Sequence, residues 1–185
     1  MRNPLIYLDS SVLLDVITGQ KVSKARRGAR VLAAVAEGRA RGVASWLVLA
    51  EVVSAPGPGV PPNIREHVTQ ILEHGQLLRW VEVERLISRD ARLLGRRFPG
   101  VAGADAVHLA TALRVHADYL LTTDLKFLRK LHGHDDTGPA RVDHLTVQQP
   151  ELVWDADIFE SCEEEQDLDA EHQDDQGAPP ARSQH

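Results

Sequence analysis

Residues 4–14 read PLIYLDSSVLL and combine a short apolar run with one acid and two hydroxyl residues. The apolar residues 5–8 favour a buried β-strand, and Asp9 follows where that strand is expected to end. Ser10 and Ser11 are residue types that cap helices, and the apolar residues after them predict a helix. In an open α/β sheet the ligand crevice lies beyond the carboxyl ends of the parallel strands, so Asp9 is predicted to face it. The simpler alternative makes Asp9 a turn residue or a helix cap.

The rest of the chain alternates between strand and helix patterns. Further strands are predicted at 43–45, 77–83, 118–121 and 141–147, and helices at 22–41, 46–53, 63–72, 84–97, 104–116 and 125–131. Strands and helices that alternate in this way form a parallel sheet with helices on both faces. We therefore expect a three-layer α/β/α domain with a central, mainly parallel sheet of four to five strands.

The charge divides the chain into two parts. The whole chain has a net charge of -6; residues 1–150 contain 20 Lys and Arg and 15 Asp and Glu, a net of +5, whereas residues 151–185 contain one Arg and 12 acids, a net of -11. From residue 160 onward apolar residues are almost absent, which predicts disorder. We expect a folded domain over 1–150 and an acidic, disordered tail over 151–185. The tail either solubilises the protein or imitates phosphates and competes for the basic face of the core.

Cysteine content and hydropathy indicate the compartment. The chain has one cysteine, Cys162, so no internal disulfide forms and a reducing compartment fits best. No uninterrupted apolar stretch approaches the ~20 residues of a membrane span, and the N-terminal apolar run is too short for a signal peptide. The sequence therefore predicts a cytoplasmic protein with no membrane partner.

Three further acids lie where they can join Asp9. Glu51 is flanked on both sides by apolar residues of a predicted helix, where an unpaired charge is costly. Asp105 lies in the first turn of the helix after Gly103, and Asp124 follows the strand at 118–121. Each acid also has a simpler explanation, which is a polar helix face for Glu51 and a helix-terminal anion or cap for the two aspartates.

Converging carboxylates repel one another, by about 4 kcal/mol for two charges about 4 Å apart at an effective dielectric constant of about 20. A cluster of four acids therefore requires raised pKa values or a divalent cation. Oxygen ligands alone favour Mg²⁺ or Mn²⁺. A metal held in this way suits phosphodiester hydrolysis, because it binds a phosphate oxygen and activates the attacking water.

Four segments together resemble the PIN domain family, and within it the VapC-like ribonuclease toxins of bacterial toxin-antitoxin pairs. The segments are LDSSVLL at 8–14, LAEV at 49–52, GADAVHLA at 103–110 and ADYLLTTD at 117–124, followed by Phe127. They occur in the order and spacing of the family and cover residues 4 to about 150. The chain departs from many relatives at Lys126, where they have a second Asp.

The resemblance implies a metal-dependent endoribonuclease that uses Mg²⁺ or Mn²⁺. The residues that it implies for the acidic metal site are Asp9, Glu51, Asp105 and Asp124, with Ser11 and Thr122 as hydroxyl helpers. It also implies an RNA substrate, a homodimer and a cognate antitoxin that lies over the active site.

Other functions have weaker support in the residues. A haloacid-dehalogenase-like phosphatase needs a second Asp two residues after the first, and here that residue is Ser11. The Gly-Pro loop at 56–62 lacks the pattern of a phosphate-binding loop, and no dinucleotide fingerprint follows the first strand. A PIN fold that binds RNA or protein without catalysis remains the alternative. The segment HGHDD at 132–136 is interpreted as a solvated loop, with a transition-metal patch as the alternative, because it lacks spaced partner ligands. His108 is interpreted as a packing histidine, with a position facing the site as the alternative.

Overall fold

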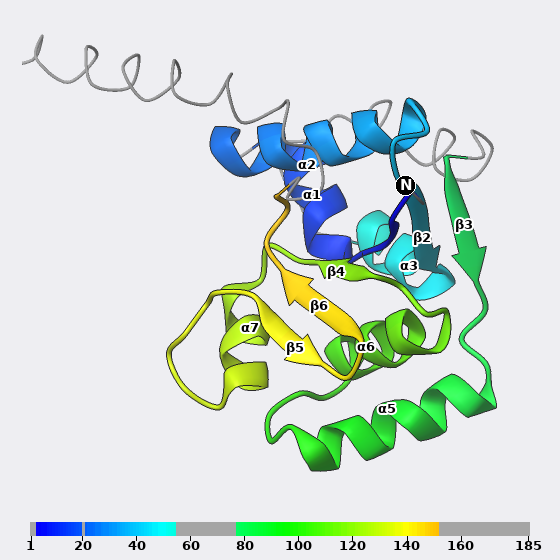
Figure 1. Cartoon of the computed structure of the whole chain (residues 1–185), viewed down its shortest axis with the longest axis vertical. Coiled ribbons are helices and arrows are strands. Elements are labelled where there is room, and N and C mark those ends of the chain that lie inside the picture. The colour runs from blue at the N-terminus through cyan, green and yellow to red at the C-terminus, as the bar shows by residue number, and fades with distance from the viewer. Residues whose placement is uncertain (1–2, 20, 55–76, 152–185) are drawn as a thin grey trace, which may run out of the picture. The chain divides into compact units, whose positions relative to one another are not determined.

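A six-stranded sheet forms the centre of the computed structural model, which describes residues 3–19, 21–54 and 77–151 (Figure 1). The strands are β1 (Leu5–Leu8), β2 (Arg41–Ser45), β3 (Leu78–Val81), β4 (Tyr119–Leu121), β5 (Ala140–Val142) and β6 (Leu145–Gln148). They lie in the order β3-β2-β1-β4-β6-β5, and all neighbours are parallel except β5 and β6. The described residues belong to one compact unit, Met1–Glu151. The helix predicted at 63–72 and the acidic tail beyond Glu151 lie outside the described residues.

Helices cover both faces of this sheet. They are α1 (Ser10–Thr18), α2 (Val22–Ala36), α3 (Trp46–Ser54), α5 (Arg85–Arg97), α6 (Ala104–Arg114) and α7 (Leu125–His132). Helix α1 packs against α2 and α3, whereas α5 packs against α6, and Figure 1 shows these two groups on opposite sides of the sheet. This arrangement confirms the predicted three-layer α/β/α architecture. Within the described residues, no helix is both long and apolar enough to cross a membrane.

Side chains of β1 serve both layers of the core. Leu5 and Tyr7 belong to a buried cluster that contains residues of α5, α6 and α7. Ile6 and Leu8 are also fully or almost fully buried but lie outside that cluster, as the alternation of a strand requires. The run of four apolar residues in the sequence therefore corresponds to a strand covered on both faces.

Two predicted elements were wrong in their bounds. The helix predicted over 22–41 ends at Ala36, and Gly38 with a φ of 72° leads into β2, which already begins at Arg41. The single strand predicted over 141–147 is a hairpin of β5 and β6 that turns at Asp143, whose φ is 55°. The apolar alternation of Ala140 and Val142 breaks at Asp143 and His144 and resumes out of phase at Leu145 and Val147, and the single-strand prediction overlooked this break. As a result, the sheet has six strands instead of four to five, and β6 lies inside it.

Strands that follow β1 in the chain are placed first on one side of it and then, from β4 onward, on the other side. From β1 the chain adds β2 and β3 on one side, and then β4 and β6 on the other. In open α/β sheets the crevice for ligands lies at such a switch point, outside the carboxyl ends of the strands. The register pairs Leu8 with Leu121, so the residues that follow, Asp9 and Thr122, leave the sheet side by side.

Candidate active site

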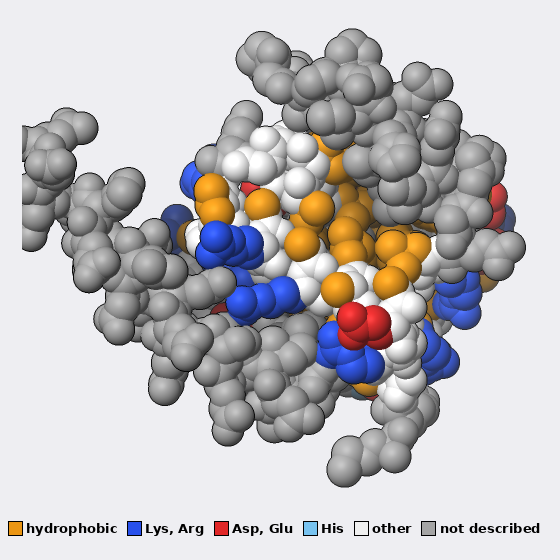
Figure 2. All heavy atoms as spheres, turned by 90° about the horizontal axis from the view of Figure 1, so that it is seen from above, with side chains coloured by type: hydrophobic (Ala, Val, Ile, Leu, Met, Phe, Trp, Pro, Cys, Tyr) orange, Lys and Arg blue, Asp and Glu red, His pale blue; other side chains and the backbone are white. Residues whose placement is uncertain are grey.

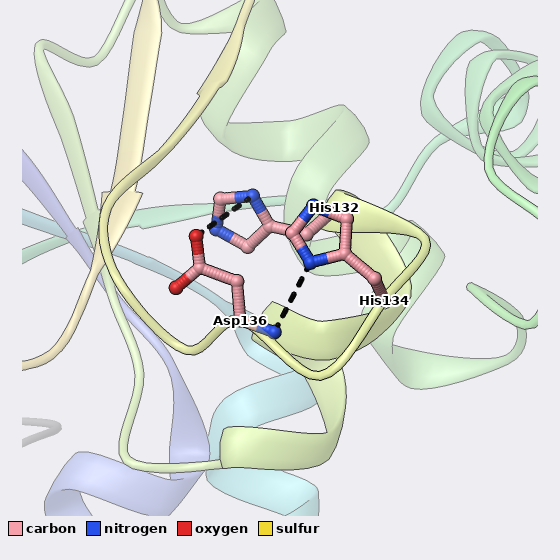
Figure 3. A group of neighbouring side chains, drawn as sticks. All are labelled: His132, His134 and Asp136. Atoms are coloured by element: carbon pink, nitrogen blue, oxygen red, sulfur yellow. Dashed lines mark hydrogen bonds and ion pairs between the residues drawn. The ribbon is translucent and has the colours of Figure 1, made fainter.

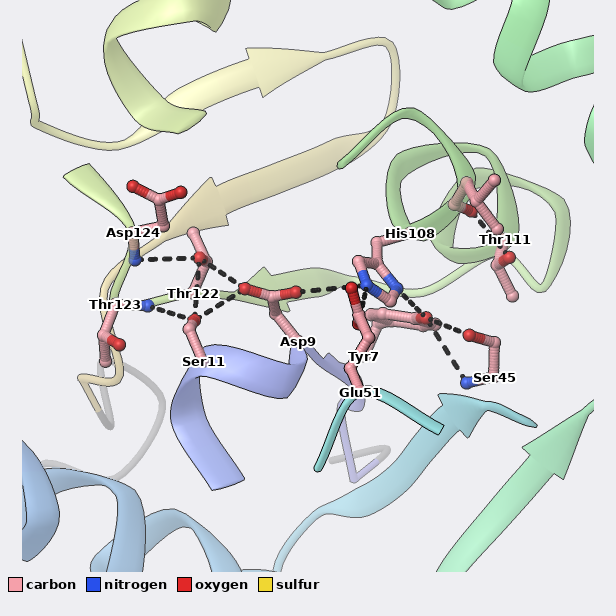
Figure 4. A network of polar contacts seen from close by, with 11 residues as sticks. Tyr7, Asp9, Ser11, Ser45, Glu51, His108, Thr111, Thr122, Thr123 and Asp124 are labelled. Carbon is pink, nitrogen blue, oxygen red and sulfur yellow. Dashed lines mark hydrogen bonds and ion pairs between the residues drawn. The ribbon is translucent and has the colours of Figure 1, made fainter. Parts of the chain in front are cut away.

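Asp9 is held by two hydroxyl groups at the switch point. Its carboxylate Oδ2 accepts hydrogen bonds from Ser11 Oγ at 2.6 Å and from Thr122 Oγ1 at 2.7 Å (Figure 4). Asp9 occupies the N-cap position of α1, yet its side chain makes no capping hydrogen bond. Because Oδ2 accepts two bonds, Oδ1 is the oxygen that remains for another ligand. The side chain is therefore oriented by the site and not by the helix terminus.

The two hydroxyls are themselves oriented by the backbone. Thr123 N donates to Ser11 Oγ at 3.0 Å, and Asp124 N donates to Thr122 Oγ1 at 3.1 Å. Each hydroxyl oxygen thus accepts from an N–H group, so its own proton is free to point at Asp9. The turn after β4 therefore fixes the position of the carboxylate.

His108 connects Asp9 with Glu51. Its Nε2 lies 2.9 Å from Glu51 Oε2 and 3.5 Å from Asp9 Oδ1, and the side chain is 2 % exposed. On the other side of the ring, Nδ1 lies 2.8 Å from Tyr7 Oη. The Tyr7 hydroxyl also contacts Ser45 Oγ, at 2.9 Å. Nε2 faces two carboxylates and therefore carries a proton, and these partners favour the imidazolium form of the ring.

The pKa shifts agree with this assignment. Burial is the largest single effect on His108 and lowers its pKa. The hydrogen bond to Glu51 and the charges of Asp9, Glu51 and Asp105 together outweigh burial, so the net effect is a raised pKa. Burial raises the pKa of Glu51, whereas the hydrogen bond and charge of His108 and the Ser10 hydroxyl lower it to a net decrease. Burial, the largest effect on Tyr7, raises the pKa of its phenol and keeps it protonated. The site thus contains a buried cation between two acids.

Asp105 and Asp124 have other partners. Asp105 Oδ2 forms an ion pair with Lys130 Nζ of α7 at 2.7 Å. Asp124 is the N-cap of α7, and its Oδ1 accepts from Lys126 N at 2.8 Å. The capping role considered for Asp124 is therefore present in the structure.

The sequence-predicted site residues thus divide into a group connected by hydrogen bonds and ion pairs and two acids, Asp105 and Asp124, that have partners of their own. The connected group consists of Asp9, Glu51, Ser11 and Thr122. Within the described ranges, the four predicted acids do not place their ligand atoms within 4.8 Å of one another. Each carboxylate is instead balanced by hydroxyl or N–H donors or by a cation of the protein, as the repulsion between like charges requires.

Several residues of the site were not predicted from the sequence. Tyr7 and Ser45 orient His108, and Lys130 is the partner of Asp105. The interpretation of His108 as a packing histidine was incomplete, because it is buried and also contacts both acids. A usable signal was its position three residues after Asp105, since residues at i and i+3 share one face of a helix.

The donor set suits a hard divalent cation. Asp9 Oδ1 and the half-buried Glu51 carboxylate offer oxygen ligands at the carboxyl edge of the sheet, with Asp105 on the neighbouring helix α6. Mg²⁺ and Mn²⁺ prefer such ligands. The protein is therefore an α/β protein with an acidic site, supported by two hydroxyl groups, at the carboxyl edge of its parallel strands.

The chain belongs to the PIN domain family, whose profile, described as "PIN domain", matches residues 6–131. Its fold is similar to those of several solved toxins and toxin-antitoxin complexes. A toxin-antitoxin complex from Klebsiella pneumoniae has a TM-score of 0.52 at 17 % identity, covering 80 % of this chain and 99 % of that one. VapC20 of Mycobacterium tuberculosis, described as a sarcin-ricin loop cleaving toxin, has a TM-score of 0.54 at 14 % identity, and the match covers 66 % of this chain and 92 % of that one. VapBC2 of Rickettsia felis, bound to a DNA fragment from its promoter, has a TM-score of 0.52 at 15 % identity, and the match covers 80 % of this chain and 99 % of that one. No curated protein matches the sequence.

Proposed function

We propose that the protein is a metal-dependent endoribonuclease and the toxin of a toxin-antitoxin pair. The observation that carries this proposal is the position of Asp9, fixed by Ser11 and Thr122 at the switch point and joined through His108 to Glu51. Membership of the PIN domain family supports nuclease chemistry. The similarity to a toxin that cleaves the sarcin-ricin loop and to toxin-antitoxin complexes supports the toxin role.

The residues that we propose as holders of Mg²⁺ or Mn²⁺ are Asp9, Glu51, Asp105 and Asp124. When bound, such a cation supplies a Lewis acid for a phosphate oxygen and lowers the pKa of the attacking water. Ser11 and Thr122 keep Asp9 in one orientation, because both hydroxyls donate to the same oxygen. His108 offsets the charge of two acids that would otherwise repel each other.

A basic helix beside the site is proposed to position the RNA backbone. Helix α2 carries Lys24, Arg26, Arg27 and Arg30, and Figure 2, seen from the side of α2 in Figure 1, shows exposed Lys and Arg side chains. Lys24 Nζ donates to Thr123 O at 3.0 Å, which brings this helix to the rim of the site. Cations at such a rim contact phosphates regardless of sequence.

The remaining parts of the proposal concern the setting of the reaction. We propose a cytoplasmic homodimer that acts on RNA and is neutralised by a cognate antitoxin. The solved toxin-antitoxin complexes of similar fold support the antitoxin. The acidic residues 151–185 stay a predicted disordered tail, with solubilisation or inhibition as its two possible roles.

One observation favours a second candidate, a PIN fold that binds RNA or protein without catalysis. Asp105 and Asp124 are engaged by Lys130 and by the start of α7, so only part of the acidic set faces Asp9. RNA binding by Asp9→Asn equal to wild type, with no cleavage by either protein, is the result expected for this binding module.

The test is cleavage of a labelled pool of structured RNAs by antitoxin-free protein with Mg²⁺, with Mn²⁺ and with EDTA. Asp9→Asn and Glu51→Gln are the test variants, and Asp90→Asn, which alters an exposed ion pair with Arg114, is the matched control. We expect cuts that require metal, persist in the control and disappear in both test variants. Cuts that survive EDTA or either test substitution would overturn the proposed nuclease site.

A further inference from the structure

Two histidines and an aspartate converge in the loop after α7. Helix α7 ends at His132, and Gly133, with a φ of 73°, turns the chain back so that His134 and Asp136 approach the end of the helix (Figure 3). One ligand atom from each of His132, His134 and Asp136 lies within 4.8 Å of the others. No other such group of His, Cys or acidic residues occurs in the ranges that the structure describes.

The ring of His132 is fixed in a tautomer that suits a metal ligand. Its Nε2 lies 3.0 Å from the carbonyl oxygen of Gly138, and a carbonyl only accepts, so Nε2 carries the proton. The lone pair of the neutral ring is then on Nδ1, which lies 3.9 Å from Asp136 Oδ2. A histidine that donates its second N–H to a backbone carbonyl is the usual arrangement in metal sites. His132 is half-buried, which limits the motion of the ring.

Asp136 is also oriented by the backbone. Its Oδ1 accepts from Gly138 N at 2.8 Å, which leaves Oδ2 directed at His132. Asp136 therefore presents Oδ2 toward the His132 ring, where a metal ion can reach it.

His134 completes the group from the solvent side. Its ring stacks on that of His132, with centroids 5.5 Å apart and an interplanar angle of 30°. Its Nδ1 accepts from Asp136 N at 3.2 Å. A metal ion bound to His134 must therefore replace this hydrogen bond or take Nε2 after a turn of the ring. Both changes are available to an exposed side chain.

We propose that His132, His134 and Asp136 form a site for a divalent transition-metal ion, with Zn²⁺ as the best fit. Two imidazoles and one carboxylate are ligands that Zn²⁺ takes at about 2.0–2.2 Å, with a fourth position open to water. Tetrahedral ligands at that distance lie about 3.4 Å apart. The three ligand atoms, which lie within 4.8 Å of one another, therefore need to approach by at most about 1.4 Å. Imidazole ligands favour Zn²⁺, Ni²⁺ or Cu²⁺ over Mg²⁺, which separates this site from the acidic one.

The site connects two elements that meet near the acidic residues. His132 is the last residue of α7, while Asp136 and Gly138 lie in the connection to β5. Helix α7 also carries Lys130, the partner of Asp105. A metal bound here therefore joins the end of α7 to the loop before β5 and stabilises that connection by mass action.

The experiment is a titration of the untagged full-length chain with Zn²⁺ by calorimetry, in excess Mg²⁺ to saturate hard-ligand sites. The test variants are His134→Ala and Asp136→Asn, because both side chains are exposed, and His132→Ala as a third. The matched control is His144→Ala. His144 forms a similar ring pair with His116, at 5.2 Å and 34°, which lies outside the metal-ligating group.

We expect wild type and His144→Ala to bind one more equivalent of Zn²⁺ than the test variants, or to bind it at least tenfold more tightly. With Co²⁺ as the probe, the visible absorption of a tetrahedral complex should appear in the control and be lost in His134→Ala. Equal Zn²⁺ binding by wild type, His134→Ala and Asp136→Asn overturns the site, as does an equal loss in His144→Ala. Because the readout is binding, it is independent of whether the chain cleaves RNA.

Discussion

His108 Nε2 lies 2.9 Å from Glu51 Oε2, and this contact joins a helix of one layer to a helix of the other. The imidazole passes beside the end of β1, where Asp9 Oδ1 is 3.5 Å away. An ion pair that is mostly buried is favourable only if its remaining polar atoms are satisfied. Tyr7, itself bonded to Ser45, contacts Nδ1, the other ring nitrogen of His108. The buried ion pair therefore depends on a row of four contacting side chains, Ser45, Tyr7, His108 and Glu51.

The first prediction concerns the pH dependence of stability. The pKa of His108 is raised from 6.5, so its contribution is fully present below pH 6.5 and is lost as pH rises through the higher folded value. The pKa of Glu51 is lowered from 4.5, so its contribution is present above pH 4.5 and is lost as pH falls through the lower folded value. The pair therefore stabilises the metal-free fold most between about pH 4.5 and 6.5.

Urea unfolding in EDTA, followed from about pH 4.5 to pH 9, measures this contribution. His108→Gln should lose about 3 kcal/mol at pH 6, because two acids remain without their cation, and the loss should shrink as pH rises. His144→Gln, an exposed histidine, is the control. A loss for His108→Gln that is the same from pH 6 to pH 9 would mean that the ring acts by packing and not by charge.

The second prediction concerns the two hydroxyls on Asp9. Ser11→Ala and Thr122→Val each remove a hydrogen bond to a charged oxygen, worth about 1.5–3 kcal/mol. Part of this energy positions Asp9 for catalysis, so each variant should lower kcat about tenfold or more, with a smaller change in KM. Because both donate to Oδ2, the double variant should lose less than the sum of the single losses.

Additive losses in that cycle would mean that the two hydroxyls act on different groups. Ser88→Ala, whose hydroxyl donates to the carbonyl of Glu84 one turn earlier, is the matched control and should keep wild-type kcat. Thermal unfolding of all variants separates loss of activity from loss of fold.

Much of this site followed from the sequence, and the part that did not has a physical explanation. Asp9 and Thr122 end strands whose apolar runs are short and clear, so their place at the sheet edge was predictable. The contact between Glu51 and His108 depends on how two helices from different layers meet, which no local pattern encodes. The hairpin at Asp143 was missed although the apolar alternation changes phase there, because two strands of three and four residues resemble one strand with a single irregular step. The group at His132, His134 and Asp136 was interpreted as solvated loop, since its convergence requires the left-handed Gly133.

The third prediction concerns metal binding at the acidic site. Mn²⁺ at 100 times its dissociation constant should stabilise wild type by about 2.7 kcal/mol and raise its Tm. Asp9→Asn should show a much smaller shift, because the proposed ligand atom Oδ1 loses its charge. Asp143→Asn, which pairs with Arg97 in an exposed ion pair, should respond like wild type. A Tm that does not change with Mn²⁺ in wild type would contradict a shared metal site.

The last prediction follows from the ion pair between Asp105 and Lys130, at 2.7 Å. If Asp105 is a metal ligand, the ammonium group competes with the metal for the same oxygen. Lys130→Met removes this competitor and keeps the aliphatic part that packs near Gly100. We expect tighter Mn²⁺ binding, by several-fold, together with a loss of no more than about 1 kcal/mol in metal-free stability, because the pair is partly exposed. Arg97→Met removes a cation of an exposed ion pair with Asp143 and should leave Mn²⁺ affinity unchanged. Weaker Mn²⁺ binding in Lys130→Met would instead show that Lys130 holds Asp105 in its ligating position, because a competitor and a positioning residue shift the affinity in opposite directions.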